Sequence, residues 1–284
     1  MSIRPSFVTN EFAELAEMLD DKGYLLGSKI GSGTYSQVRL VKRKSDGKTL
    51  VTKIINIKSA AQDYVETFLP RELDIMVKVH HEHIASVEEI IHIDDWVFVI
   101  MEYAAKGDMM DFITNKGAMS EQEAKRAFRQ MAMAVDYLHE NNIIHRDIKC
   151  ENILIKENGD IIVSDFGFSR TIKDNELCRT YCGSCAYACP QIIRGIPYDG
   201  KGSDVWGMGC VLFVMLFGKM PFDDISLKRM IQSQDKGISL SRRVANPLPE
   251  SCKCLLKSVL EPDQTKRYTT KDILNSEWLK EGDK

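Results

Sequence analysis

Two segments in the middle of the chain contain the residue types best suited to chemistry. The first, residues 144–152 (IHRDIKCEN), places a carboxylate, a cation and an amide between apolar flanks. The second, residues 165–167 (DFG), adds another carboxylate. Asp147 could accept the proton of a hydroxyl group, while Asn152 and Asp165 could hold a divalent metal ion on phosphate groups. The two segments together predict phosphoryl transfer.

A glycine-rich segment, residues 31–38 (GSGTYSQV), lies near the start of the chain. Gly31 and Gly33 would let backbone N–H groups approach phosphate oxygens without interference from a Cβ atom. The same pattern also occurs in plain hairpins. A dinucleotide-binding fingerprint requires a helix after the glycines, whereas a second strand is expected here, which argues against a Rossmann fold.

Lys53 stands within an apolar, β-branched strand. It could be a surface residue, or a buried ammonium that binds phosphates and needs a carboxylate partner. Glu72 is the candidate partner.

The elements around these residues divide the chain into two parts. The apolar, β-branched runs 39–41, 50–57, 86–93 and 97–101 predict strands, with one helix over about 62–80. Helices follow after Glu102, including 120–141, which opens with a capping box formed by Ser120 and Glu123, and a buried helix over 205–217. Residues 1–23 contain apolar residues at helical spacing and predict a short helix or a tail, with a partner-docking helix as the alternative.

Composition narrows the class of partner. The 284 residues carry a net charge of −3, are 44% apolar, and show no basic footprint for nucleic acid or an anionic membrane. The 205–217 run is too short to span a bilayer. The start of the chain lacks the apolar segment of a secretory signal, so we expect the eight cysteines to lie in a reducing compartment without a disulfide framework.

The combined motifs resemble the catalytic domain of eukaryotic protein kinases over about residues 24–279. A lysine two residues after Asp147, here Lys149, makes this loop resemble that of the serine/threonine branch of the family. Four further runs are similar to the testis-specific serine/threonine kinase family, within the calmodulin-dependent-kinase-like group, namely 68–72 (FLPRE), 181–184 (YCGS), 186–190 (AYACP) and 221–224 (PFDD).

The resemblance implies an α+β, bilobal fold. It places a β-rich N-lobe at 24–101, a hinge at 102–106 and a mainly helical C-lobe at 107–279, flanked by an extension (1–23) and a tail (280–284). Within the C-lobe, Asp204 resembles the residue of an anchor helix that braces the catalytic loop.

The resemblance also implies ATP and Mg²⁺ as cofactors. Asp147 would be the catalytic base, Lys149 would steady the γ-phosphate, and Asn152 and Asp165 would hold Mg²⁺. Lys53 would pair with Glu72 and touch the α and β phosphates. The remaining expected nucleotide-binding residues are Ile30, Gly31, Ser32, Gly33, Val38, Val51, Met101 as gatekeeper, Glu102, Ala104, Asp108 and Leu154.

Regulation and peptide binding are implied in the same way. Thr180 would take an activating phosphate, received by Arg146 with support from Arg170. Asp108 and Glu151 match positions that receive arginines upstream of the phosphorylated residue, and the alternative is two solvated acids. Ser184 resembles the residue that hydrogen-bonds the catalytic aspartate and lysine.

The four cysteines of the activation segment (178, 182, 185 and 189) lack a second ligand pair at zinc-finger spacing. A redox switch through a thiolate near Arg179 is the alternative to the ordinary loop that we favour.

Two departures from the family pattern favour a second hypothesis, a weakly active or inactive pseudokinase-like scaffold. Gln191 replaces a glutamate that would pair with Arg267, and Val51 replaces an alanine that would line the adenine site. Ser36 in place of a third glycine is a milder change.

The expected partners are protein substrates, together with an upstream activating kinase or autophosphorylation and a chaperone. We expect a monomer, without nucleic acid or membrane binding. The chain ends soon after Leu279, so we expect no calmodulin-binding tail and control through the activation loop or other molecules. We expect a cytoplasmic or also nuclear location, and the resemblance implies expression in male germ cells.

Overall fold

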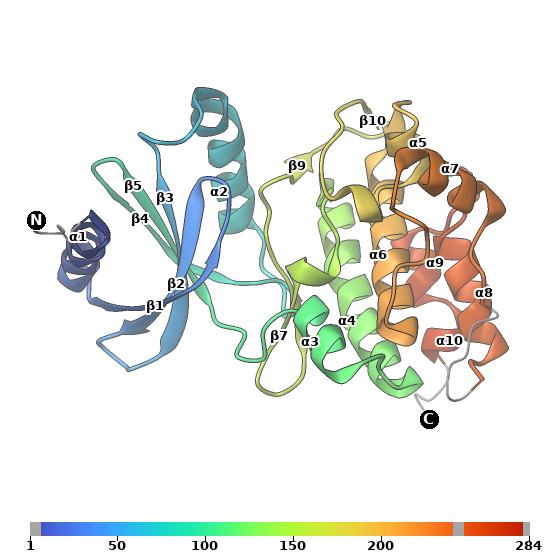
Figure 1. The fold of residues 1–284 in the computed structure, drawn as a ribbon, viewed down its shortest axis with the longest axis horizontal. Helices are drawn as coiled ribbons and strands as arrows, with labels where there is room; N and C mark the ends of the chain where they lie inside the picture. The colour runs from blue at the N-terminus through green and yellow to red at the C-terminus, as the bar shows by residue number, and fades with distance from the viewer. Residues whose placement is uncertain (1–6, 241–246, 281–284) are drawn as a thin grey trace, which may run out of the picture. The chain divides into compact units, whose positions relative to one another are not determined.

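The structure is a computed structural model that describes residues 7–240 and 247–280. Residues 1–6 of the predicted extension and 281–284 of the predicted tail lie outside the described residues. The chain forms two compact units: unit 1 comprises residues 1–70 and 86–103, and unit 2 comprises 71–85 and 104–284. Strands dominate unit 1 and helices dominate unit 2, so the predicted α+β class is confirmed (Figure 1).

Unit 1 is built on a five-stranded antiparallel sheet with the order β1-β2-β3-β5-β4. Its elements are α1 (Phe7–Asp21), β1 (Tyr24–Ser32), β2 (Ser36–Arg43), β3 (Thr49–Asn56), the π-helical turn η1 (Tyr64–Phe68), β4 (Val87–Ile93) and β5 (Trp96–Glu102). The β-branched runs form strands because their side chains pack well on a pleated, half-buried surface.

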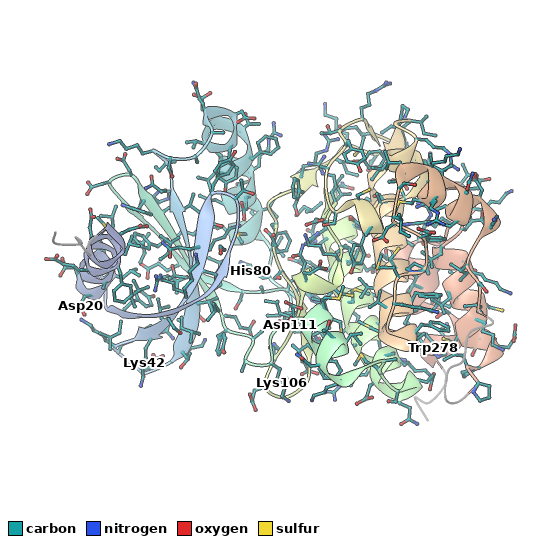
Figure 2. The ribbon with its side chains drawn as sticks, in the orientation of Figure 1. Asp20, Lys42, His80, Lys106, Asp111 and Trp278 are labelled. Carbon is teal, nitrogen blue, oxygen red and sulfur yellow. The ribbon has the colours of Figure 1, made fainter. Side chains whose placement is uncertain are left out.

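α1 packs on this sheet. Leu15 and Leu19, one helical turn apart, are 1% and 0% exposed and join a buried cluster with Leu50, Ile54 and Phe98 of the sheet. In its last turn, Asp20, labelled in Figure 2, forms an ion pair with Lys44 at 2.7 Å. The predicted helix is therefore confirmed, and it serves the core of its own unit rather than standing apart as a tail.

Unit 2 is mainly helical. Its helices are α2 (Leu69–Lys78, which begins at the end of unit 1), α3 (Met109–Lys116), α4 (Glu121–Glu140), α5 (Pro190–Ile193), α6 (Gly200–Phe217), α7 (Leu227–Lys236), α8 (Glu250–Val259), α9 (Thr270–Leu274) and α10 (Glu277–Lys280), with 3₁₀ turns η2 (Cys150–Asn152) and η3 (Cys185–Tyr187). Its short strands are β6 (Ile143–Ile144), β7 (Ile153–Ile155), β8 (Ile161–Val163), β9 (Arg170–Thr171), β10 (Leu177–Cys178) and β11 (Tyr198–Asp199).

The two longest helices form the centre of unit 2. The predicted capping box starts α4, since Ser120 accepts from the backbone of Glu123 and Glu123 accepts from the backbone of Ser120. α6 packs against α4 and α8, and its residues from Gly202 to Leu216 are all buried. Trp278, labelled in Figure 2, is fully buried and donates to Glu121 at the start of α4. None of the helices within residues 7–240 and 247–280 has the length and apolarity needed to cross a membrane.

Short antiparallel ribbons complete the part of unit 2 that the structure describes. They pair β6 with β9, β7 with β8, and β10 with β11. These ribbons connect the loops that contain the predicted catalytic and regulatory residues, because β6 and β7 flank residues 145–152, and β8 and β9 flank residues 164–169.

Candidate active site

The segment after β6 is pinned to α6 by one buried carboxylate. Asp204, 1% exposed, accepts the backbone N–H groups of His145 at 2.9 Å and Arg146 at 2.7 Å. The Nε2 atom of His139, on α4, lies 2.9 Å from the same carboxylate. Arg146 has a φ of 66°, a left-handed conformation that non-glycine residues rarely adopt. The hydrogen bonds to Asp204 hold this strained turn in place.

The carboxylate of Asp147 is the most constrained group of this loop. It is 5% exposed, and its Oδ1 accepts from the backbone N–H of Ser184 at 2.9 Å and from its hydroxyl at 3.1 Å. Its Oδ2 lies 2.7 Å from the ammonium of Lys149 and 3.2 Å from the amide nitrogen of Asn152. Lys149 also donates to the Ser184 hydroxyl at 3.0 Å. A carboxylate, an ammonium and a hydroxyl are thus brought together.

Close approach to Asp147 requires a glycine at position 183. Gly183 has a φ of 84°, and a Cβ atom on it would lie 2.5 Å from the carbonyl oxygen of Arg146 and 3.3 Å from Oδ1 of Asp147. Any larger residue would therefore push the loop that contains Ser184 away from the carboxylate.

A short hairpin brings Asn152 and Asp165 to one end of two paired strands. Ile153 of β7 pairs with Val163 of β8, so Asn152 lies opposite Ser164. The backbone N–H of Ser164 donates to the carbonyl of Asn152 at 2.9 Å. Asp165 follows directly, exposed to solvent and with a φ of 63°. The amide and the second carboxylate therefore occupy neighbouring positions.

The residues after Asp165 are fixed by burial. Phe166 is 1% exposed, and its ring centre lies 5.3 Å from that of His145. Glu72, on α2, is 2% exposed, and one of its carboxylate oxygens lies 3.8 Å from where a Cβ atom on Gly167 would be. α2 thus brings Glu72 beside the Asp-Phe-Gly turn.

Four of the predicted nucleotide-binding residues of unit 1 share one face of its sheet, namely Val38, Val51, Lys53 and Met101. Val38 pairs with Lys53, and Val51 pairs with Met101. Directly paired residues in antiparallel strands point to the same face, and so do residues two apart along one strand. Gly31 lies opposite Val38. The neighbouring Ile30 is 49% exposed, and Ser32 and Gly33 continue the turn, whose Gly33 N–H donates to the carbonyl of Ser36 at 2.8 Å.

The hinge residues are divided between the units. Glu102 ends β5 in unit 1, where it pairs with Leu50. Ala104, 8% exposed, begins unit 2. Asp108 and Leu154 of unit 2 form an isolated β-bridge, so the structure brings these two residues together. Lys53 and Glu72 also belong to different units, and their pairing stays a prediction.

The two arginines predicted to receive the phosphate, Arg146 and Arg170, lie near Cys178, two residues before Thr180. Arg146 Nε donates to the carbonyl of Phe168 at 2.7 Å, and Arg170 forms an ion pair with Glu176. Arg146 is close enough to Cys178 and Cys182 to favour their thiolates electrostatically. Thr180 lies between these two cysteines, exposed, with its carbonyl accepting from the Tyr198 hydroxyl at 3.0 Å.

The environments of Cys178 and Cys182 in the activation segment do not favour a reactive thiolate. Burial is the main effect on Cys178 and Cys182, and it raises the pKa of both thiols despite the nearby Arg146. No disulfide forms among the cysteines of the described residues, and Cys185 is exposed while Cys189 is buried. Across residues 7–240 and 247–280, no three His, Cys, Asp or Glu side chains are grouped to bind a metal ion.

Two acidic residues were predicted to contact a peptide. Glu151 is exposed and accepts a hydrogen bond from the Tyr187 hydroxyl at 3.4 Å. Asp108 caps α3 by accepting from the backbone N–H of Asp111 at 2.8 Å. Part of the Asp108 carboxylate therefore has a structural role.

The unusual Gln191 makes the contact that its position suggests. Its Oε1 accepts from Arg267 at 3.2 Å, and its Nε2 donates to the carbonyl of Pro262 at 2.7 Å. Arg267 is 6% exposed and also donates to the carbonyls of Glu261, Gly202 and Pro262. Burial lowers the pKa of this guanidinium. A neutral amide thus replaces the carboxylate of the expected pair.

Some positioning residues were missed by sequence reasoning. His139, Gly183 and Tyr198 contact the loops only through the tertiary fold. His139 could have been noticed as a polar residue on the buried stripe of α4, because a buried imidazole requires a partner.

Comparison with known proteins places this geometry in a family. The protein kinase domain family matches residues 24–279. The chain is 39% identical over 270 residues to mouse testis-specific serine/threonine-protein kinase 2, covering 93% of this chain and 75% of the relative. It is 38% identical over 268 residues to mouse testis-specific serine/threonine-protein kinase 3, covering 93% and 99%. It is 34% identical over 278 residues to human testis-specific serine/threonine-protein kinase 4, covering 92% and 84%.

These matches confirm the predicted resemblance and the bilobal kinase fold, and protein kinases act on protein substrates. The chain belongs to the protein kinase family and is a protein serine/threonine kinase.

Proposed function

We propose that this kinase transfers the γ-phosphoryl group of Mg-ATP to serine and threonine hydroxyls of protein substrates. The observation that supports this most directly is the environment of Asp147. Its buried carboxylate accepts two hydrogen bonds from Ser184 and lies 2.7 Å from the ammonium of Lys149. A fixed base beside a fixed cation suits proton acceptance next to a developing phosphate charge.

In the proposed reaction, Asp147 accepts the proton of the attacking hydroxyl. The hydroxyl oxygen forms a bond to the γ-phosphorus while the bond from that phosphorus to the β,γ-bridging oxygen breaks, and ADP leaves. Lys149 places its positive charge on the transferring phosphoryl group. The Ser184 hydroxyl, bonded to both side chains, keeps them aligned with the substrate hydroxyl.

Asn152 and Asp165 would hold Mg²⁺, which neutralises the phosphate charge when bound. The amide nitrogen of Asn152 donates to the carbonyl of Asp147 at 2.8 Å, so its oxygen is the atom suited to a cation. An amide oxygen and an exposed carboxylate are ligands that Mg²⁺ prefers. A small set of protein ligands fits this ion, because phosphates and water supply the others.

The nucleotide would use the Val38 and Lys53 face of unit 1. Gly31, Ser32 and Gly33 would cover the phosphates. Lys53 would contact the phosphates, with Glu72 as its partner. The residues that would contact the adenine are Ile30, Val38, Val51, Met101, Glu102, Ala104, Asp108 and Leu154. Val51 adds two methyl groups to a position that pairs with Met101, so we expect a narrower adenine site than an alanine would give.

Phosphorylation of Thr180, by an upstream kinase or by the protein itself, is proposed to raise activity. Arg146 directly precedes Asp147, and its backbone N–H donates to Asp204. A phosphate bound by the Arg146 side chain would therefore stabilise the loop that contains Asp147. We expect Thr180→Ala to lower kcat/KM for a peptide at least about tenfold, measured after full phosphorylation of the wild type. Equal rates for the two proteins would contradict this role.

Substrates with arginine upstream of the phosphorylated residue are proposed to be preferred. The exposed Glu151 supports this preference, and the free side of the Asp108 carboxylate could add to it. A peptide-library screen without a basic preference would remove the idea.

A transfer assay with radiolabelled ATP, Mg²⁺ and a basic peptide tests the proposed reaction. Asp147→Asn should lower the rate by about 10² to 10⁴, because the amide cannot accept the proton. The amide oxygen can still accept both hydrogen bonds from Ser184, but the amide nitrogen would face the donor groups of Lys149 and Asn152. The Tm of the variant is therefore measured beside its rate as a control for folding. Absence of transfer by wild type phosphorylated at Thr180 would instead favour the scaffold hypothesis suggested by Gln191 and Val51.

Expression in male germ cells is proposed from the names of the relatives, which describe those proteins as testis-specific. A cytoplasmic or also nuclear location stays a prediction from the sequence. Transcript measurement across tissues and immunofluorescence would test both.

A further inference from the structure

β2 presents alternate residues to the two faces of its sheet. Val38 pairs with Lys53, and the preceding Gln37 pairs with Ile54. Directly paired residues share a face, and successive residues point to opposite faces. Val38 and Lys53 therefore lie on one face, while Gln37, Ile54 and Arg39 lie on the other.

α1 covers the second face. Ile54 belongs to the same buried cluster as Leu15 and Leu19 of the helix. α1 therefore covers the face of the sheet opposite the one with Val38 and Lys53, which is the face of the proposed nucleotide contacts.

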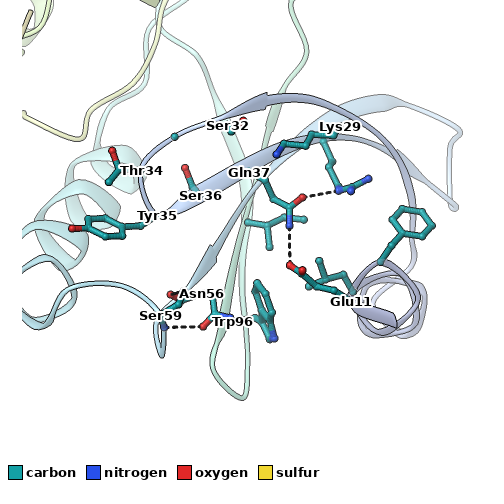
Figure 3. A pocket seen from close by; sticks show the side chains of 15 residues that line it. Glu11, Lys29, Ser32, Thr34, Tyr35, Ser36, Gln37, Asn56, Ser59 and Trp96 are labelled. Carbon is teal, nitrogen blue, oxygen red and sulfur yellow. Dashed lines mark hydrogen bonds between the residues drawn. The ribbon is translucent and has the colours of Figure 1, made fainter. Parts of the chain in front are cut away.

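A chain of contacts joins α1 to the end of the glycine-rich hairpin, as Figure 3 shows for Gln37 and Glu11. The Gln37 amide donates to Glu11 at 3.4 Å and accepts from Arg39 Nε at 2.9 Å. The Arg39 guanidinium also donates to the carbonyl of Gly27 in β1 at 3.1 Å. It lies 4.9 Å from the centre of the Phe12 ring, within cation–π distance.

Gln37 is placed to control the turn. It pairs with Ser32, the last residue of β1, where the hairpin reaches the exposed Gly33 and Thr34. On the other side of the turn, the ring of Tyr35 lies 4.9 Å from that of Tyr64. α1 and the turn line a common groove of about 700 Å³, so the turn is not packed directly on the helix. The side chains of Gln37 and Arg39 bridge this distance.

We propose that α1 is a brace for the glycine-rich turn. Phe12 holds Arg39, Arg39 orients Gln37, and Gln37 fixes the end of the hairpin whose opposite face contains Val38. The proposal rests on the proposed use of ATP and makes these three positioning residues, because none of them touches nucleotide. A turn ordered in advance loses less conformational entropy when it closes over phosphates, so the brace should strengthen nucleotide binding.

Arg39→Met is the main test, because it keeps the aliphatic stem and removes the two hydrogen bonds and the charge. We expect the Kd for Mg-ATP to rise on the order of fivefold, with the kcat and the KM for peptide unchanged. Hydrogen exchange of residues 31–37 in the nucleotide-free protein should become faster. Phe12→Ala should act in the same direction. Arg39→Lys should behave more like Arg39→Met than like the wild type, since the single lysine nitrogen cannot occupy the two positions from which Nε and Nη1 of Arg39 donate.

Two variants on α1 serve as controls. Met18 packs against the same buried cluster, so Met18→Ala should lower the Tm without changing the Kd for Mg-ATP. Glu17 is exposed, and Glu17→Gln should change neither.

The proposal is wrong if Arg39→Met changes neither the hydrogen exchange of residues 31–37 nor the Kd for Mg-ATP. It is also wrong if Met18→Ala raises this Kd equally, because that would indicate general destabilisation of unit 1. If the wild type binds no Mg-ATP, the proposed reaction fails, and the exchange experiment decides on the brace alone. Faster exchange in Arg39→Met then supports it, and equal exchange rejects it.

Discussion

Replacing Gln191 by methionine tests whether the buried amide stabilises the helical unit. The change keeps the length of the side chain and removes two hydrogen bonds, one from Arg267 at 3.2 Å and one to the carbonyl of Pro262 at 2.7 Å. A hydrogen bond from a charged donor contributes about 1.5 to 3 kcal/mol and a neutral one about 0.5 to 1.5 kcal/mol.

The structure places the expected loss at the lower end of the sum. Arg267 still donates to Pro262 at 3.2 Å, so neither the guanidinium nor that carbonyl is left without a partner. We therefore expect the free energy of unfolding to fall by about 2 kcal/mol. For a domain of this size, this corresponds to a fall in Tm of roughly 4 to 8 °C.

Differential scanning calorimetry measures this shift, with Gln232→Met as the matched control. Gln232 is exposed on α7, and its replacement should change the free energy of unfolding by less than about 0.5 kcal/mol. A fall in Tm for Gln191→Met no larger than the control's would refute the reasoning.

Gln191→Glu tests whether glutamine at this position makes the protein more or less stable than the glutamate expected from the family. The new carboxylate would gain attraction to Arg267, but one of its oxygens would replace the nitrogen that lies 2.7 Å from the carbonyl of Pro262. Repulsion between the two acceptors and desolvation of the carboxylate offset the gain, so we expect a change within about 1 kcal/mol of the wild type. A Tm increase of 10 °C or more would show that the chain loses stability through its glutamine.

Two further predictions follow from the activation segment. Gly183→Ala should lower kcat at least about tenfold, because a Cβ atom there would lie 2.5 Å from the carbonyl oxygen of Arg146. Gly237→Ala is the control: its φ is 71° and no atom lies within 4 Å of its Cβ position, so it should lower the Tm and leave kcat unchanged. Equal kcat for both variants would contradict the role of Gly183. Burial raises the pKa of the Cys182 thiol, so iodoacetamide at pH 8.5 should modify it at least severalfold more slowly than N-acetylcysteine, as measured by mass spectrometry; matching rates would restore the redox hypothesis.

The regular elements could be predicted from the sequence because their periodicity is local. The runs 39–41, 50–57, 86–93 and 97–101 each fall on a strand of the five-stranded sheet, with ends shifted by up to three residues. The predicted helix over 62–80 is divided into η1 and α2, because a π turn has no distinct side-chain pattern. Two-residue strands such as β10 have no periodicity to detect.

The candidate site was predictable where its residues are close in sequence. Asp147, Lys149 and Asn152 lie within one loop, and their mutual contacts follow from that spacing. The contact of Asp204 with His139 depends on how α4 packs against α6, which the sequence does not reveal. The role of α1 was equally hidden, because Leu15 and Leu19 form an apolar stripe without indicating what it covers.

The buried contact of α1 has a consequence for how the protein can be divided. The kinase-family match begins at Tyr24, after the helix, yet Leu15 and Leu19 cover Leu50 and Phe98, which are 0% exposed. A recombinant fragment that starts at Tyr24 would present this part of the sheet to water as a contiguous apolar patch. We expect such a fragment to self-associate and elute early in size-exclusion chromatography, whereas a fragment that retains Phe7–Asp21 keeps the patch covered.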